Sequence, residues 1–548
     1  MRRRLAVGMI AGLGMLLTIR AFSAPAVDYL FPDGAQRGTT IHLTAAGKFD
    51  IWPALIWVDS PGIHFTCAKD KGEFTVQCDK DAPIGPHLVR FFTADGTSFP
   101  RVFMVGGDPE ILEVEPNDTP RNAQHISNLP VTINGKLQQY DDTDCFAVKL
   151  SAGQRLIANL QCRRLGAGLD PMLHVLDEAG YELAFAHDGL GLDPLLQFTA
   201  PRAGIFIVRV SGFHDPPDEN TRLAGDPSDI YRLHLTTGPF ITHVLPAGVQ
   251  RGQQATLTAL GWNMPAGQTD FPIDARSVAA VWDHLMAPTP SGEMLRVEVG
   301  DGPELLASQV AGKSISAPAY INGCLEKIGQ QDSFEIAAHK GEAFHFSATA
   351  TVMGSALDPL IRIETAKDQL QAVGDWTAPE EKTYRLVISD QYHKGGDDYC
   401  YRLRIEHPKP AIQANPNAAA YVVGPGKTID VTMTGIRLTG HATPLVAIAS
   451  DLPPGIIATS AQLPPAGGAV VLKLSAATDA KPFNGLIHLF FVGVDPLRPE
   501  VDPAVFNLST EKDITQQMIY LCDPWLTVLP PPPPATTQAA TQPAAKPK

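Results

Sequence analysis

Asp144-Cys145-Phe146-Ala147-Val148-Lys149-Leu150 is the stretch that decides the fold of this 548-residue chain. The large apolar side chains of this stretch recur at every second position, and a period of two places them on one face of a β-strand. Residues 231–235 and 401–405 alternate in the same way. Gly, Pro, Asn and Asp interrupt such runs at short intervals, and no long amphipathic helical pattern follows the first 26 residues. Short alternating strands with frequent turns predict an all-β, multi-domain string of β-sandwiches.

An internal repeat organises these strands into modules. Residues 32–47 resemble residues 246–261 at a constant offset of 214, which defines one kind of module. A second kind repeats at an offset of 188, and its last strand, Tyr231-Arg232-Leu233, recurs as Tyr401-Arg402-Leu403 at an offset of 170. The matching positions of the second kind are Asn134-Gly135 with Asn322-Gly323, Asp144 and Phe146 with Asp332 and Phe334, Gly153 with Gly341, and Leu169-Asp170-Pro171 with Leu357-Asp358-Pro359. The sequence therefore predicts two copies of each module kind, with deletions absorbed by loops.

The first residues have the layout of a secretory signal peptide. Arg2, Arg3 and Arg4 precede an apolar run of about 15 residues, and small residues follow around Ala24-Pro25-Ala26. That run is shorter than the roughly 20 residues of a membrane helix, although an uncleaved anchor is the alternative interpretation. We expect a mature chain that begins near Val27, has no membrane span, and is secreted, periplasmic or attached to the cell surface.

The charge and the cysteines agree with export. A net charge of −15 without a basic cluster after the signal argues against nucleic acid and anionic lipid as partners. Disulfides persist in oxidising compartments, and seven cysteines leave at least one thiol unpaired within the chain. Proximity along the sequence suggests the following pairs: Cys67 with Cys78, Cys145 with Cys162, and Cys324 with Cys400, with Cys522 left over.

An acidic hexad, Glu113-Val114-Glu115-Pro116-Asn117-Asp118, precedes the first copy of the second module kind. Pro116 favours an extended Glu115, so alternate side chains of the hexad can face one side, and residues 117–120 have turn composition. Calcium takes six to eight oxygen ligands from carboxylates, amides and water. Three interpretations stay open on the residues alone: a calcium site, a catalytic carboxylate cluster, and a solvated linker.

The first copy resembles the bacterial pre-peptidase C-terminal domain over residues 109–237. The matching features are residues 113–119, Ala123, Ile126, Asn134-Gly135, the acidic run 141–144 before Phe146, Gly153, Leu169-Asp170-Pro171, residues 204–206 and Tyr231-Arg232-Leu233. The resemblance implies a jelly-roll-like β-sandwich that, in members related to collagenase collagen-binding domains, coordinates calcium through the acidic linker. Carried over residue by residue, it implies these calcium ligands: Glu113, Glu115, Asn117, Asp118, Asp144 and one of Asp141 and Asp142.

The same resemblance implies a domain order in which immunoglobulin-like modules flank the two copies. The predicted segments are a signal peptide (1–26), an immunoglobulin-like β-sandwich (27–108), the first pre-peptidase-like copy (109–238), a shortened immunoglobulin-like module (239–302), a degenerate second copy (303–408), a last immunoglobulin-like β-sandwich (409–528) and a Pro-rich tail (529–548). Five consecutive prolines favour an extended polyproline conformation in that tail, and its remainder has too few apolar residues to fold.

The second copy lacks the hexad. Its equivalent segment is Asp301-Gly-Pro-Glu304-Leu-Leu-Ala, and its partner loop is Gly329-Gln330-Gln331-Asp332. Because too few carboxylates remain for six to eight ligands, we predict that this copy binds no calcium.

Three common motifs of enzyme sites are absent from the sequence. Gly424-Pro-Gly426-Lys427-Thr428 lacks the first glycine of a phosphate loop and precedes a strand pattern, and neither Gly-x-Ser-x-Gly nor His-Glu-x-x-His occurs. Trp52, Trp57 and Trp262 can line a binding face, but large aromatic residues of β-sandwiches are more often core. We therefore expect a non-enzymatic protein for adhesion or for binding extracellular protein or polysaccharide. An accessory or targeting subunit of a secreted protease is the alternative, and an unrecognised hydrolase comes third.

Overall fold

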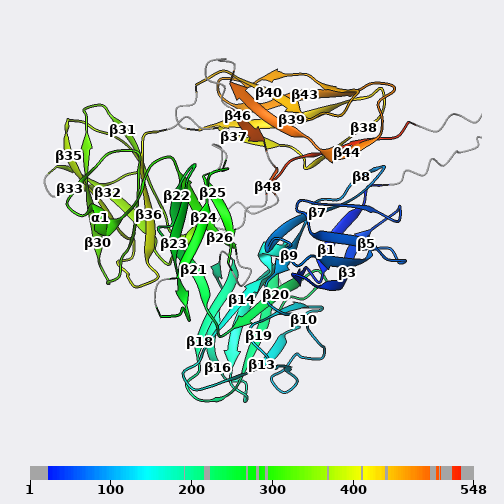
Figure 1. The fold of residues 1–548 in the computed structure, drawn as a ribbon, viewed down its shortest axis with the longest axis horizontal. Helices are drawn as coiled ribbons and strands as arrows, with labels where there is room; N and C mark the ends of the chain where they lie inside the picture. The colour runs from blue at the N-terminus through cyan, green and yellow to red at the C-terminus, as the bar shows by residue number, and fades with distance from the viewer. Residues whose placement is uncertain are drawn as a thin grey trace, which may run out of the picture.

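The structure is a computed structural model that describes residues 23–190, 192–214, 222–266, 269–278, 283–289, 294–366, 369–408, 412–438, 442–493, 501–504, 506–507 and 521–531. Most of the predicted signal peptide and of the Pro-rich tail lies outside these residues. Within them nearly all of the regular secondary structure is β-strand, arranged in packed sheets (Figure 1), so the predicted all-β, multi-domain β-sandwich fold is confirmed. Over the same ranges, no helix combines the length and the apolar character needed to cross a membrane.

The first and third modules each pair two small sheets. In the first, β1-β3-β6-β5 faces β2-β9-β7-β4, with β8 paired to β7, and in the third β21-β23-β24 faces β22-β26-β25. The strands of these two modules are β1 (Ala26–Phe31), β2 (Gly34–Gln36), β3 (Thr40–Lys48), β4 (Leu55–Val58), β5 (Ile63–Cys67), β6 (Glu73–Cys78), β7 (Gly85–Thr93), β8 (Gly96–Thr97), β9 (Arg101–Gly106), β21 (Phe240–Leu245), β22 (Gly248–Gln250), β23 (Gln254–Trp262), β24 (Asp270–Asp274), β25 (His284–Pro288) and β26 (Met294–Gly300).

The second module has sheets in the order β10-β12-β20-β14-β18-β17 and β11-β13-β19-β15-β16. Its strands are β10 (Glu110–Leu112), β11 (Gln124–Ile126), β12 (Val131–Lys136), β13 (Asp144–Leu150), β14 (Arg155–Gln161), β15 (Leu169–Leu176), β16 (Glu182–Ala186), β17 (Gly189–Leu190), β18 (Asp193–Thr199), β19 (Gly204–His214) and β20 (Ile230–Thr236), with the 3₁₀ turn η1 (Arg163–Leu165).

The fourth module repeats this topology as β27-β29-β36-β31-β34 and β28-β30-β35-β32-β33. Its elements are β27 (Glu304–Leu306), α1 (Ala307–Val310), β28 (Ser314–Ile315), β29 (Ala319–Cys324), β30 (Gln331–Ala338), β31 (Ala343–Thr349), η2 (Thr351–Met353), β32 (Pro359–Ala366), β33 (Gln369–Ala372), β34 (Asp375–Thr377), β35 (Lys382–Asp390) and β36 (Cys400–Glu406). In both modules the first strand pairs in parallel with the third, at Glu110–Thr132 and Glu304–Tyr320.

The fifth module contains the sheets β37-β39-β43-β41, β38-β49-β44 and β42-β40-β45-β46, and the short pair β47-β48. Its strands are β37 (Ile412–Pro416), β38 (Ala420–Val423), β39 (Thr428–Arg437), β40 (Leu445–Ser450), β41 (Ile456–Ala458), β42 (Ala461–Gln462), β43 (Gly468–Ala476), β44 (Phe483–Leu486), β45 (His488–Gly493), β46 (Val501–Ala504), β47 (Phe506–Asn507), β48 (Leu521–Cys522) and β49 (Trp525–Val528). The glycine-rich segment before β39, residues 424–427, contains a turn that leads into the strand.

The alternating residues of β13 build the core of the second module. Phe146, Val148 and Leu150 are buried between its two sheets together with the apolar face of β20. This core extends into the first module, because Leu88 and Met104 belong to the same cluster. The first and second modules therefore share one apolar interior.

An arginine clamp joins the members of each module pair. In the second module the Arg232 guanidinium lies 2.7 Å from a Glu110 carboxylate oxygen and packs against Gly34 of the first module. In the fourth, Arg402 pairs with Glu304 at 2.5 Å and packs against Gly248 of the third. Both arginines are buried, and burying a charge is tolerated only when it is paired. The structural repeat is thus a pair of modules locked by the same arginine.

The chain doubles back so that the fifth module lies against the first (Figure 1). The Trp525 ring packs 5.9 Å from Trp57 and 5.2 Å from Phe92, measured between centroids. Arg90 of the first module donates to the Ala419 carbonyl oxygen at 3.2 Å, across 329 positions of sequence. We call this contact the closure.

The structure confirms one of the three predicted disulfides. Cys324 and Cys400 are bonded and connect the neighbouring strands β29 and β36. The Cys67–Cys78 prediction is wrong, because both thiols are free. The β5–β6 register places Cys67 opposite Phe74, while Cys78 lies at the other end of the hairpin, opposite Ile63.

The Cys145–Cys162 prediction is also wrong, since both thiols are free and buried. Cys145 lies in a small cluster with Ala123 and Ile207, whereas Cys162 belongs to the main core between the sheets. Proximity in sequence does not place two cysteines on one side of a sheet.

Candidate metal centre

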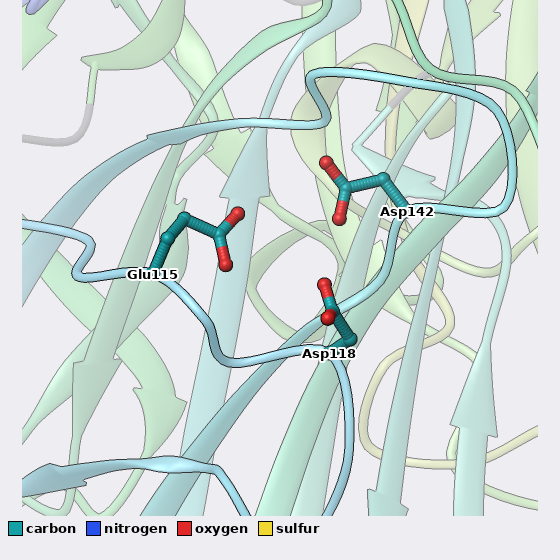
Figure 2. Close-up of side chains that lie close together, drawn as sticks. All are labelled: Glu115, Asp118 and Asp142. Atoms are coloured by element: carbon teal, nitrogen blue, oxygen red, sulfur yellow. The ribbon is translucent and has the colours of Figure 1, made fainter.

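Three carboxylates of the second module converge at its N-terminal end. Single oxygens of Glu115, Asp118 and Asp142 all lie within 4.8 Å of one another, and Figure 2 shows their side chains pointing into a common space. Two belong to the acidic hexad and the third to the loop before β13. The structure thus brings together segments that are separated by more than 20 residues.

Backbone hydrogen bonds fix the hexad against that loop. The Glu113 amide donates to the Asn134 carbonyl oxygen at 3.0 Å, which continues the parallel pairing of β10 with β12. The Cys145 amide donates to the Asn117 carbonyl oxygen at 3.0 Å, and the Thr143 hydroxyl donates to the Asp118 carbonyl oxygen at 2.8 Å. The hexad is therefore held in place by main-chain contacts, unlike a solvated linker.

A second acidic pair lies deeper in the module. The Tyr231 hydroxyl donates to Asp144 at 2.5 Å and approaches Glu113 at 3.1 Å. The other Glu113 oxygen accepts from the Lys136 amide at 2.9 Å. Tyr231 was not among the predicted site residues, although its recurrence as Tyr401 in the second copy was a usable signal.

Several polar atoms of the centre are buried without a hydrogen-bond partner. They are both side-chain polar atoms of Asn117, Oδ1 of Asp142 and Oδ1 of Asp144. These residues are 0, 4 and 0% exposed. A buried oxygen without a donor is costly, and such an atom in a native protein indicates an additional ligand such as an ion or a water molecule.

Burial and mutual repulsion disfavour charge at this centre. Burial raises the pKa of Glu113 and that of Asp144, and for Asp144 the adjacent Glu113 raises it further. Burial also raises the pKa of Glu115 and of Asp142, with the neighbouring carboxylates adding to the shift. A bound cation would reverse this preference, because it stabilises the ionised form.

Asp141 lies outside the converging group. Its backbone is in the left-handed region, at φ 65°, a conformation that Asp adopts more readily than most residues. Its carboxylate accepts from Arg222 at 2.7 Å and from the Leu223 amide at 3.2 Å. Of the two alternatives that the sequence left open, Asp142 is the one that faces Glu115 and Asp118.

The fourth module has a different structure at the equivalent position. The segment after β27 forms the short helix α1, and Ala307 lies beside Gly323 as Glu113 lies beside Gly135, so Ala307 takes the place of Glu113. Asp332 is retained and accepts from the Tyr401 hydroxyl at 2.6 Å, as Asp144 does from Tyr231. The framework of aspartate and tyrosine is thus common to both copies, and the extra carboxylates occur only in the first.

A serine, a histidine and a glutamate also lie in a row on the outer face of the second module. The Ser211 hydroxyl is 3.3 Å from His174 Nε2, and His174 Nδ1 is 2.8 Å from Glu182. Burial is the main cause that lowers the pKa of His174. Ser211 is only 2% exposed, so a substrate cannot reach its hydroxyl, and we assign the row a structural role.

The three tryptophans that could have lined a binding face take part in packing, which is the more common role of large aromatic residues in β-sandwiches. Trp52 packs on Phe74 and donates to the Ala68 carbonyl oxygen at 3.1 Å. Trp57 contacts Trp525 in the closure, and Trp262 stacks on Phe240. All three are partly buried.

Comparisons with known proteins give a limited relationship. No known family model matches the chain, so the pre-peptidase resemblance stays a prediction. A probable subtilase-type serine protease of Deinococcus radiodurans is 32% identical in an alignment of 142 residues, and the match covers 24% of this chain and 19% of that protein. The chain therefore matches about a fifth of the length of this relative.

Solved structures align only loosely. Elastase-activated alpha-2-macroglobulin of Escherichia coli has a TM-score of 0.14 at 12% identity, covering 91% of this chain and 52% of that chain. Tripeptidyl peptidase 2 has a TM-score of 0.13 at 9% identity, covering 88% of this chain and 40% of that chain. The S-layer protein rSbsC has a TM-score of 0.13 at 8% identity, covering 88% of this chain and 54% of that chain. Scores this low carry no argument about function.

Proposed function

We propose that the chain is a secreted, non-enzymatic binding or adhesion protein in which calcium stabilises the second module. The partner would be an extracellular protein or polysaccharide. The observation that supports the calcium site is the set of buried, unpartnered oxygens beside three converging carboxylates. Export is supported by the confirmed Cys324–Cys400 disulfide, because disulfides are retained in oxidising compartments.

The residues at the centre fit calcium by their chemistry. Calcium is a hard cation that takes six to eight oxygens, and its ligands commonly combine carboxylates, amide oxygens and water. Glu115, Asp118 and Asp142 offer carboxylates, and Asn117 and Asp144 each offer an unpartnered oxygen. Bound calcium would supply positive charge. The residues of the chain would then hold the hexad against the loop before β13 and so stiffen the start of the module.

A calcium titration of the full chain, followed by calorimetry and by melting temperature, tests this proposal. Ligand that binds only the folded state stabilises it by about 2.7 kcal/mol at a hundredfold excess over Kd. We expect heat of binding and a raised melting temperature in the wild type. Both should be lost when Glu115→Gln is combined with Asp118→Asn.

The matched control is Glu335→Gln with Asp375→Asn, which neutralises two exposed carboxylates of the fourth module. This variant should retain the full calcium response. A wild-type chain that shows neither heat nor a melting shift at millimolar calcium would mean that the centre is not a calcium site.

An accessory or targeting role beside a secreted protease is the second candidate. It is favoured by the 142-residue match to a probable subtilase-type serine protease. Co-purification of the chain with a secreted protease would support it, whereas recovery with a surface polysaccharide or matrix protein would support the first proposal. Hydrolysis of a substrate panel that a single substitution abolishes would contradict both.

A further inference from the structure

A cavity of about 470 Å³ lies where the third and fourth modules meet. Its walls include Leu245 from the end of β21, Ala307 from α1, Cys324 from the end of β29, Glu326 from the following loop, and Asp332 from the start of β30. A volume of this size is within the usual range of small-ligand pockets.

The cavity occupies the place that the metal centre has in the second module. By the repeat, Ala307 corresponds to Glu113, Gln330 to Asp142 and Asp332 to Asp144. Ala307 and Gln330 are uncharged, and Ala307 is also much shorter than Glu113. The space that the hexad fills in the second module therefore stays open in the fourth. The two copies thus share a framework and differ in what this position can hold.

In the second module an ammonium group of the chain itself packs on Phe31, the residue that corresponds to Leu245 of the cavity wall. Lys136 extends from the end of β12, and its Nζ lies 4.7 Å from the centroid of the Phe31 ring. The repeat matches Phe31 to Leu245 and Lys136 to Cys324. Because Cys324 is short and bonded to Cys400, it cannot supply an ammonium at the equivalent position of the fourth module.

The walls of the cavity carry negative charge without a compensating cation. Glu326 and Asp332 line it, and among the described residues no Lys, Arg or His does. Asp332 accepts hydrogen bonds from two neutral groups, the Tyr401 hydroxyl at 2.6 Å and the Gln330 side-chain amide at 3.1 Å. Leu245 and Leu306 add an apolar wall.

We propose that this cavity binds a primary ammonium on an alkyl stem, namely a lysine side chain of a partner polypeptide. An ammonium has three donors and no acceptor, which matches the carboxylates of Glu326 and Asp332. Lysine commonly packs its methylene stem along apolar surface while the charged end binds elsewhere, and here Leu245 and Leu306 offer that surface. The site is independent of calcium, because it lies in the copy without the hexad.

Ligand-observed saturation-transfer NMR on the full chain in EDTA tests the proposal. The probes are N-α-acetyl-lysine methylamide, its neutral isostere N-α-acetyl-norleucine methylamide, and 1,4-diaminobutane. We expect transfer to the lysine probe and little to the norleucine probe. Stronger transfer to the lysine probe than to the diamine assigns the site to a polypeptide lysine, and the reverse order would overturn that assignment.

Glu326→Gln and Asp332→Asn should each lower the affinity for the lysine probe at least about tenfold, since a hydrogen bond to a charged group is lost. Asp332→Asn keeps an oxygen for the Tyr401 hydroxyl, and an unchanged melting temperature verifies folding. Glu335→Gln, on the same β30 strand but outside the cavity, is the matched control and should bind normally. Equal binding of the norleucine probe, or unchanged affinity in both cavity variants, would overturn the proposal.

Discussion

At the scale of single residues, Asp141 and Asp142 are adjacent aspartates with different surroundings. Asp142 faces Glu115 and Asp118, whereas the Asp141 carboxylate is bound by Arg222. We predict that Asp142→Asn lowers calcium affinity at least about tenfold, while Asp141→Asn changes it less than threefold. Calorimetric titration of the two variants measures this difference. Equal losses in both, or a larger loss in Asp141→Asn, would contradict the arrangement of the centre.

The raised pKa values predict how pH acts on the centre. Without metal, Glu113 and Asp144 retain protons that the unfolded chain has already lost, so their contribution to folding stability declines as pH rises above their ordinary values, near 4.5 and 3.8. Calcium must displace these protons, and its affinity should therefore rise between pH 5 and 8, by up to about tenfold per pH unit for each proton released.

Titrations at four pH values, with melting curves in EDTA, measure both trends. Glu113→Gln is the comparison, because it removes one titrating carboxyl and also the Glu113 charge that raises the pKa of Asp144. The pH dependence of calcium affinity should be weaker in this variant than in the wild type. Identical pH profiles for the two proteins would show that Glu113 is not part of the coupled group.

Sequence reasoning reached the residue types of the centre but not its arrangement. The hexad and the loop before β13 were recognisable because acidic residues gather there. The direction of each side chain depends on long-range backbone contacts, such as the Cys145 amide bonded to the Asn117 carbonyl oxygen. The role of Tyr231 depends on burial between two sheets, which a single strand pattern does not show.

At the scale of elements, the Cys324–Cys400 disulfide holds the end of β29 to the start of β36. Reduction, or Cys324→Ser combined with Cys400→Ser, should destabilise the fourth module by roughly 2–5 kcal/mol, since closing a long loop restricts the unfolded chain. Denaturant unfolding with and without reductant measures this loss of unfolding free energy. Cys67→Ser, which alters a free thiol, is the control and should change little.

Strands were predictable because their period of two is local, and the repeat supported each assignment twice. Cysteine pairing was not, because it depends on strand register and on which face of a sheet a residue takes. The β5–β6 hairpin places its two cysteines at opposite ends, and a sequence cannot give that register without its turn. The arginine clamps were missed for a similar reason, since each joins residues that are remote in sequence.

At the scale of the whole molecule, the closure brings together the two ends of the folded chain. Trp525 is 1% exposed and contacts Trp57, Phe92 and Arg90 of the first module. Trp525→Ala should cost roughly 3–5 kcal/mol and release the fifth module, because truncating a buried aromatic residue leaves a cavity at the contact. Small-angle X-ray scattering should then show a larger radius of gyration.

Trp262→Ala is the control for this prediction, because Trp262 stacks on Phe240 within the third module, away from the closure. That variant should keep the wild-type radius. An unchanged radius in Trp525→Ala, with the fifth module still folded, would contradict the closure. No sequence pattern pointed to this contact, since its two sides are 329 positions apart at Arg90 and Ala419.

The closure also sets the path that tension would take through the molecule. Gly96 in β8 lies against Ala24 at the start of the described chain and against Val422 in the strand beside β49. A pull on the two ends would therefore load this one contact first, and the four remaining junctions would carry force only after it had ruptured. The protein would then lengthen in steps. The first step would be rupture of the closure, and the extension of the remaining modules would follow.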